Sequence, residues 1–223
     1  MKYFRDFDKQ ADAIGVKANV PTVAIIDGIN KVCFGVGDIS KDNIFIEDGD
    51  FIKLDEATKE TRIVVTYNVS STTETTQLLS SSVSASNVIA SMEIDGKEVD
   101  VVNEYIFAST GEHIVKYIFK DSTQIAEFAF SSCRSVASVF IPDTVTTINS
   151  SAFATCSLAS VTIGSGITTI SQLAFMNTPI TSITFGGTVD QWKAINRGMM
   201  WHMNVTATTV TCSDGECELD ATA

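Results

Sequence analysis

Few of the residue types that carry catalysis occur in this chain, and they form no recognised catalytic motif. The only histidines are His113 and His202. His113 lies in a strand-like run at 112–116, where we expect a half-exposed strand histidine rather than a general base. The sequence contains no nucleophile-elbow, zinc-protease or phosphate-loop motif. It therefore predicts a protein that is not an enzyme and that uses no cofactor.

One acidic stretch, Asp38–Asp42, begins like the calcium-binding loop of an EF-hand. Asn43 stands where glycine should turn the chain, and Gly49 stands where a bidentate glutamate should close the site. We therefore expect a solvated turn here and no bound metal ion.

The cysteines are an odd and sparse set, which is not typical of a secreted disulfide framework. They are Cys33, Cys133, Cys156, Cys212 and Cys217. We expect Cys133 and Cys156 to be small buried thiols rather than metal ligands, because no histidine is near them in the sequence. Cys212 and Cys217 flank an Asp-Gly turn signal, and the sequence leaves open whether they form a disulfide.

Composition excludes several classes of protein. The chain has 223 residues, 44% of them hydrophobic, which is enough for a substantial core. Its 27 acidic and 15 basic side chains give a net charge of −12, which argues against binding to nucleic acid or to an anionic membrane surface. No apolar run reaches the roughly 20 residues that span a bilayer. The first residues lack the apolar run of a secretory signal, so we expect the chain to start in the cytosol.

An internal repeat dominates the second half of the chain. Three segments share an isoleucine, an Ala-Phe pair and a short alternating strand, with a period of about 22 to 23 residues. The strands are predicted from the period-2 alternation that ends each segment. Stacking of such coils would place Phe130, Phe153 and Phe175 in one column and give a continuous aromatic core.

These repeats resemble the BspA-like family of leucine-rich repeats, whose motif has the same A-F-x-x-C core. Ile141-Pro142 matches the I-P that often ends its strands, and the segments 185–195 and 210–215 are similar to those that frequently end such arrays. The resemblance covers roughly residues 120–217. The array departs from the family in having only three coils and in carrying Thr178 where the third cysteine would stand. The resemblance implies a solenoid used for adhesion or surface display.

The whole chain is predicted to be mainly β. We expect an N-terminal arm and hairpin for attachment at 1–55, a small Ig-like β-sandwich at 56–121, the repeats at 122–187 and a C-terminal cap and tail at 188–223. The alternating run 63–69 and the paired runs 22–26 and 31–34 support the strands. Tyr3, Phe4 and Phe7 lie on one face of an amphipathic segment that either docks on a partner or frays against its own domain.

The outward positions of the three repeat strands form the candidate binding surface. They include Ser138, Phe140, Ser160, Thr162, Ser182 and Thr184. Three strands offer only about 250 Å², well under the roughly 800 Å² per partner of a standard protein interface, so we expect binding to depend on display in many copies. Trp192 and Trp201 near the last coil would either cap the solenoid, which we favour, or contact a ligand.

We interpret the chain as a non-enzymatic structural or adhesion protein, most simply a phage virion component such as a head fibre, a capsid decoration or a tail protein. Its N-terminal region would bind other virion proteins, and its repeats would bind a host surface protein or glycan, in a homo-oligomer. The alternative is a bacterial cell-surface adhesin, which would need an export signal. A glycan-binding module is a third hypothesis, based on the hydroxyl-rich face and the tryptophans.

Overall fold

The computed structural model describes residues 21–26, 31–36, 44–47, 50–53 and 62–221. The chain divides into two compact units, residues 1–59 and 60–223. The predicted attachment residues Tyr3, Phe4 and Phe7 and the calcium-like stretch 38–43 lie outside the described residues.

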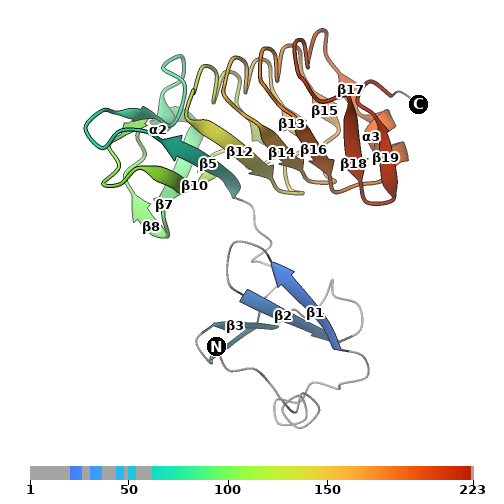
Figure 1. The fold of residues 1–223 in the computed structure, drawn as a ribbon, viewed down its shortest axis with the longest axis horizontal. Coiled ribbons are helices and arrows are strands. Elements are labelled where there is room, and N and C mark those ends of the chain that lie inside the picture. Colours follow the sequence, from blue (N-terminus) through green and yellow to red (C-terminus); the bar gives the residue numbers. More distant parts are fainter. Residues whose placement is uncertain (1–20, 27–30, 37–43, 48–49, 54–61, 222–223) are drawn as a thin grey trace. The chain divides into compact units, whose positions relative to one another are not determined.

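The first unit contains a four-stranded antiparallel sheet whose strands follow one another in chain order (Figure 1). The strands are β1 (Pro21–Ile26), β2 (Lys31–Val36), β3 (Ile44–Glu47) and β4 (Asp50–Lys53). The register places Ile25 opposite Val32, which confirms the hairpin predicted from the two β-branched runs.

The second unit is built on one nine-stranded sheet, so the prediction of a mainly β protein is confirmed. Its strand order is β19-β18-β16-β14-β12-β5-β10-β7-β8. The strands are β5 (Ile63–Val69), β7 (Ile89–Ile94), β8 (Lys97–Val99), β10 (Gly111–Phe119), β12 (Val136–Ile141), β14 (Ser160–Ile163), β16 (Ser182–Phe185), β18 (Thr209–Cys212) and β19 (Gly215–Glu218).

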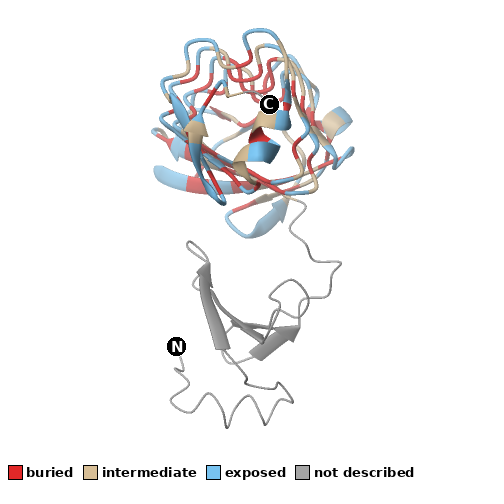
Figure 2. Ribbon diagram, turned by 90° about the vertical axis from the view of Figure 1, so that its right-hand side faces the viewer, coloured by how far each residue is buried: buried red, intermediate tan, exposed pale blue. Residues whose placement is uncertain are grey.

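A second layer faces the inner side of this sheet. It consists of a parallel sheet, β11 (Gln124–Ile125), β13 (Thr147–Ile148), β15 (Thr169–Ile170) and β17 (Asn196–Arg197), and of an antiparallel pair, β6 (Thr76–Gln77) and β9 (Glu104–Tyr105). Two short helices, α2 (Ala85–Val88) and α3 (Val189–Ala194), complete the unit. Buried and exposed residues alternate along the strands, so one side of each strand faces the core and the other faces solvent (Figure 2).

The segment expected as a small Ig-like sandwich does form two layers, but its larger layer is continuous with the repeats. β5 pairs with β10 on one side and with the first repeat strand, β12, on the other, both in antiparallel fashion. β12 then pairs with β14 in parallel. An unpaired edge of β12 would leave backbone groups without partners, and β5 supplies those partners. The upstream strands therefore cap the solenoid and extend its sheet.

The structure contains a fourth coil that the sequence pattern does not reveal. Each coil turns at two non-glycine residues with positive φ four positions apart, at 128 and 132, 151 and 155, and 173 and 177, and the same pair recurs at 200 and 204. The strands of this coil, β17 and β18, stack in parallel on β15 and β16. The sequence pattern missed this coil because Trp201 stands where the other coils have alanine. The equivalence follows from the hydrogen bonds between coils: Phe153 N donates to Ala174 O, and Phe175 N donates to Trp201 O in the same way.

Candidate functional site

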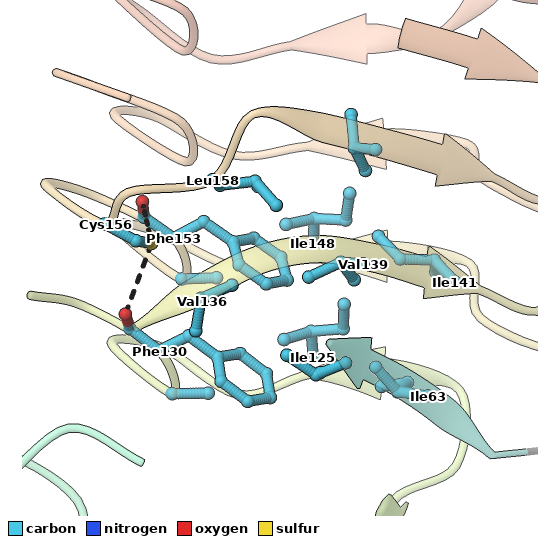
Figure 3. Packing of buried hydrophobic residues seen from close by; sticks show 14 of the residues in the cluster. Ile63, Ile125, Phe130, Val136, Val139, Ile141, Ile148, Phe153, Cys156 and Leu158 are labelled. Atoms are coloured by element: carbon cyan, nitrogen blue, oxygen red, sulfur yellow. Dashed lines mark hydrogen bonds between the residues drawn. The ribbon is translucent and has the colours of Figure 1, made fainter. Parts of the chain in front are cut away.

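The core of the coils fixes which side chains can reach solvent. The rings of Phe130 and Phe153 stack with centroids 5.1 Å apart and planes tilted by only 4° (Figure 3). Those of Phe153 and Phe175 stack with centroids 5.3 Å apart and planes tilted by 3°. The predicted aromatic column is thereby confirmed. Because the rings repeat at nearly the spacing of the strands, each coil lies in register on the next, and equivalent side chains form rows.

A buried donor closes the turn that follows Phe153 and the turn that follows Phe175. The Cys156 thiol donates to the carbonyl oxygen of Phe153 at 2.7 Å and lies 3.4 Å from that of Phe130 (Figure 3). In the third coil the Thr178 hydroxyl donates to the carbonyl oxygen of Phe175 at 2.6 Å. Threonine therefore replaces cysteine at this position without loss of the hydrogen bond.

The column of thiols has the chemistry of a packing element. Cys133 and Cys156 are both buried, as predicted. Burial raises the pKa of the Cys133 thiol to about 12, and burial, with the nearby Cys133 sulfur, raises that of Cys156 still further. Both sulfurs are therefore protonated at neutral pH, and a protonated thiol is a poor nucleophile. Within the described residues, no group of histidine, cysteine and carboxylate side chains is arranged to hold a metal ion.

The predicted binding residues on the strands lie together on the outward side of the nine-stranded sheet. The fourth coil adds two more, so that the hydroxyl face, as we name it, comprises Ser138, Phe140, Ser160, Thr162, Ser182, Thr184, Thr209 and Thr211. The strand register arranges them in two rows. One row runs Ser138, Ser160, Ser182, and the other runs Phe140, Thr162, Thr184, Thr211.

The hydroxyl face ends in charged strands on both sides. On one side Phe140 lies opposite Val64 of β5, and Val64 lies opposite Lys116 of β10. The Lys116 ammonium is 3.2 Å from a carboxylate oxygen of Glu93, whose other oxygen is 3.1 Å from the Arg62 guanidinium. On the other side β19 carries exposed Glu216 and Glu218. The face between these ends carries no charged side chain, although the chain has a net charge of −12.

Trp192 and Trp201, the other two candidate binding residues, are not on this face. Both are buried, with exposed fractions of 0% and 4%. Their ring centroids are 6.1 Å apart, and Trp201 lies 6.3 Å from Phe175, the last ring of the column. The Trp192 indole N–H donates to the carbonyl oxygen of Leu219 at 3.2 Å. They cover the end of the aromatic column, which is the capping role that the sequence favoured, and neither ring is exposed at the surface.

A serine, a histidine and an aspartate meet at one end of the large sheet, which the sequence did not predict. His113 is 8% exposed rather than half exposed. Its Nδ1 is 2.6 Å from Asp95 Oδ2, and its Nε2 is 3.3 Å from the Ser109 hydroxyl and 3.0 Å from the Ser109 carbonyl oxygen. His113 and Asp95 are 18 residues apart, and local sequence patterns do not identify such a pair. The only local signal is the Asp95-Gly96 turn, which marks the position of Asp95 but not its partner.

This triad-like arrangement fits a clamp better than a catalytic site. Burial lowers the pKa of the His113 imidazole, but the hydrogen bonds to Asp95 and to the Ser109 carbonyl more than offset it, so the pKa is raised above its ordinary value. An imidazole that donates from both ring nitrogens holds its proton and has no lone pair to accept one from the Ser109 hydroxyl. The contacts tie the loop before β10 to the turn between β7 and β8.

The Asp-Gly turn predicted between Cys212 and Cys217 forms the β18–β19 hairpin, in which Cys212 lies opposite Gly215 and Val210 opposite Cys217. Both cysteines are free thiols in this structure. Burial, reinforced by the adjacent Cys217, raises the pKa of the Cys212 thiol to about 11. The pair therefore belongs to the capping hairpin and lies on the side of the sheet away from the hydroxyl face.

Comparison with known proteins agrees with the geometry of the coils. No helix among the residues that the structure describes is long and apolar enough to cross a membrane. Neither the curated proteins nor the solved structures contain a significant match to this chain. The family model of the BspA type leucine rich repeat region, however, matches residues 100–213 in six copies. The match covers half of the sequence and includes β10, all four coils and β18, the first strand of the capping hairpin, so the chain belongs to the BspA-type leucine-rich repeat family.

Proposed function

We propose that this protein is a non-enzymatic adhesion or interaction module that binds its target with the hydroxyl face and the sheet around it. The single observation that carries the proposal is the continuity of the nine-stranded sheet. Strands of three to nine residues, about 4.8 Å apart, offer roughly 700 Å² on the outward side. This is close to the roughly 800 Å² per partner of a standard interface, whereas the three strands foreseen from the repeats offer about a third of it.

The division of the chain into two units supports a separation of roles. We propose that residues 1–59 attach the protein to a larger assembly and that residues 60–223 present the sheet to a target. Many copies on one particle would multiply weak contacts by about 10² to 10⁴ in avidity. A phage virion component, such as a head fibre, a capsid decoration or a tail protein, is the setting that we propose for such display, and a bacterial cell-surface adhesin is the alternative.

Substitution on the hydroxyl face tests the role of the sheet. A double variant, Thr162→Lys with Thr184→Lys, places two charges in the neutral row. Its matched control is Ser157→Lys, which adds a charge on the same coil outside the strands. The measurement is the binding of the fluorescent full-length protein to cells of the target host. We expect the double variant to bind at least tenfold less than the unmodified protein and the control to bind equally well. Equal binding by all three proteins would refute the proposal.

The proposed setting has its own test, which is mass spectrometry of purified phage particles. A virion component is expected at a stoichiometric level in the particles. Its absence would reject the virion assignment and leave the adhesion module intact. A secretion signal upstream of Met1 in the parent reading frame would favour the bacterial adhesin instead.

A further inference from the structure

The hydroxyl groups of the hydroxyl face are free to bind a molecule outside the protein. Some threonine hydroxyls of the coils are used within the fold, as Thr146 donates to Thr123 O and Thr181 to Ala159 O. Among the described residues, none of the seven serine and threonine hydroxyls of the face makes a hydrogen bond to another protein group. Each can therefore both donate and accept toward a molecule outside the protein.

The chemistry of the face excludes the usual anchors of protein recognition. Binding hot spots on protein interfaces are enriched in tryptophan, tyrosine and arginine, whereas serine and threonine are under-represented in them. The two tryptophans of the chain are buried, and Arg62, which lies beyond Val64, is paired with Glu93. The face is also uncharged, so it offers no electrostatic complement to an acidic or a basic partner. Its one large apolar group is Phe140, which is 40% exposed.

A neutral glycan has the features that complement such a surface. Its hydroxyl groups both donate and accept hydrogen bonds, and the C–H groups on one side of each sugar ring pack on an aromatic ring, whose face carries partial negative charge. Phe140 stands at the head of the row that continues through Thr162, Thr184 and Thr211. A chain of sugars that crosses the strands would meet the ring first and then one hydroxyl about every 4.8 Å.

We infer that the hydroxyl face binds a neutral glycan chain that runs across the strands, with one sugar on Phe140 and the following sugars along the threonine row. This inference rests on the proposed function and names the class of its target. Each contact exchanges one hydrogen bond with water for another, so a single head binds weakly and display in many copies provides the strength.

The direct test is a glycan array probed with the full-length protein coupled to beads in many copies. We expect neutral linear glycans among the hits, and at least a tenfold loss of their signal with Phe140→Ala and with the double variant Thr162→Val and Thr184→Val, which removes two hydroxyls and keeps the shape. The matched control is Phe128→Ala, because Phe128 is also 40% exposed but lies in a coil turn outside the face. Thermal unfolding of each variant confirms that it remains folded. No neutral hit, hits to charged glycans alone, or an equal loss with Phe128→Ala would overturn the inference.

A second experiment separates this inference from the proposed function. Periodate oxidation destroys glycans on the target cells and leaves most surface protein in place. If periodate abolishes binding of the unmodified protein, the glycan inference is supported. If binding persists after periodate but is lost with the lysine variant of the face, the target is a protein, and the proposed function stands while the glycan inference falls. If the lysine variant still binds, both fall.

Discussion

Removal of one ring from the aromatic column should destabilise the second unit more than any other single truncation of a phenylalanine. Phe153 is fully buried and stacks between Phe130 and Phe175 at 5.1 and 5.3 Å. Phe153→Ala loses the transfer energy of the ring and leaves a cavity, which together cost about 3–5 kcal/mol. It also breaks two ring pairs that are worth about 0.5–1.5 kcal/mol each beyond their buried area. We therefore expect a loss near the upper end of the range, about 4–5 kcal/mol.

Urea unfolding of the full-length protein, followed by tryptophan fluorescence, measures this loss. Trp201 packs edge-on against Phe175, so its emission reports on the far end of the same column. Phe140→Ala is the control, because this ring is 40% exposed and we expect it to change the free energy of unfolding by less than about 1 kcal/mol. A cost below about 2 kcal/mol for Phe153→Ala, or an equal cost for the two variants, would mean that the coils do not share one stacked core.

Three further changes test other contacts of the second unit. Thr178→Val leaves a buried carbonyl without its donor and should cost about 1–3 kcal/mol in urea unfolding, whereas Thr178→Cys should cost less because a thiol donates at the equivalent place in the second coil. Gly166→Ala places a Cβ 1.8 Å from the backbone oxygen of Asp143, which cannot move without its coil, so we expect a lower thermal midpoint and a cost of about 1–3 kcal/mol. Because the pKa of His113 is raised in the folded protein, its bond with Asp95 stabilises the fold fully below about pH 6.5, and this stabilisation is lost as the pH rises through the folded-state pKa. Urea unfolding curves recorded between pH 5.5 and 8.5 should show this loss of stability. The variant His113→Gln should remove the pH dependence.

The parts of the fold that depend on short-range patterns could be predicted from the sequence. The period of the repeats predicted the strands β12, β14 and β16 and the column of phenylalanines. This was possible because each coil closes over about 22 residues and stacks on the coil that precedes it in the sequence. The β18–β19 hairpin followed from an Asp-Gly turn.

The parts that depend on distant pairing could not be predicted. The contact of β5 with β12 joins residues about 70 positions apart, and nothing in either strand marks the other as its neighbour. The fourth coil escaped detection because Trp201 and His202 replace the Ala-Phe pair, although its strand residues Thr209 and Thr211 keep the alternation. As a consequence, the candidate face was identified at its centre, and its true extent was underestimated.

The two edge strands of the large sheet carry features that disfavour edge-to-edge association. A sheet of parallel coils would grow indefinitely if its edges were free, because each edge strand offers unpaired N–H and C=O groups. Here both edges are closed by short antiparallel strands, β8 with Lys97 and Glu98 exposed and β19 with Glu216 and Glu218 exposed. An incoming strand would have to desolvate these charges without a partner for them. Edge pairing is therefore disfavoured at both ends, and the uncharged rows between them remain the surface on which contact with another molecule costs least.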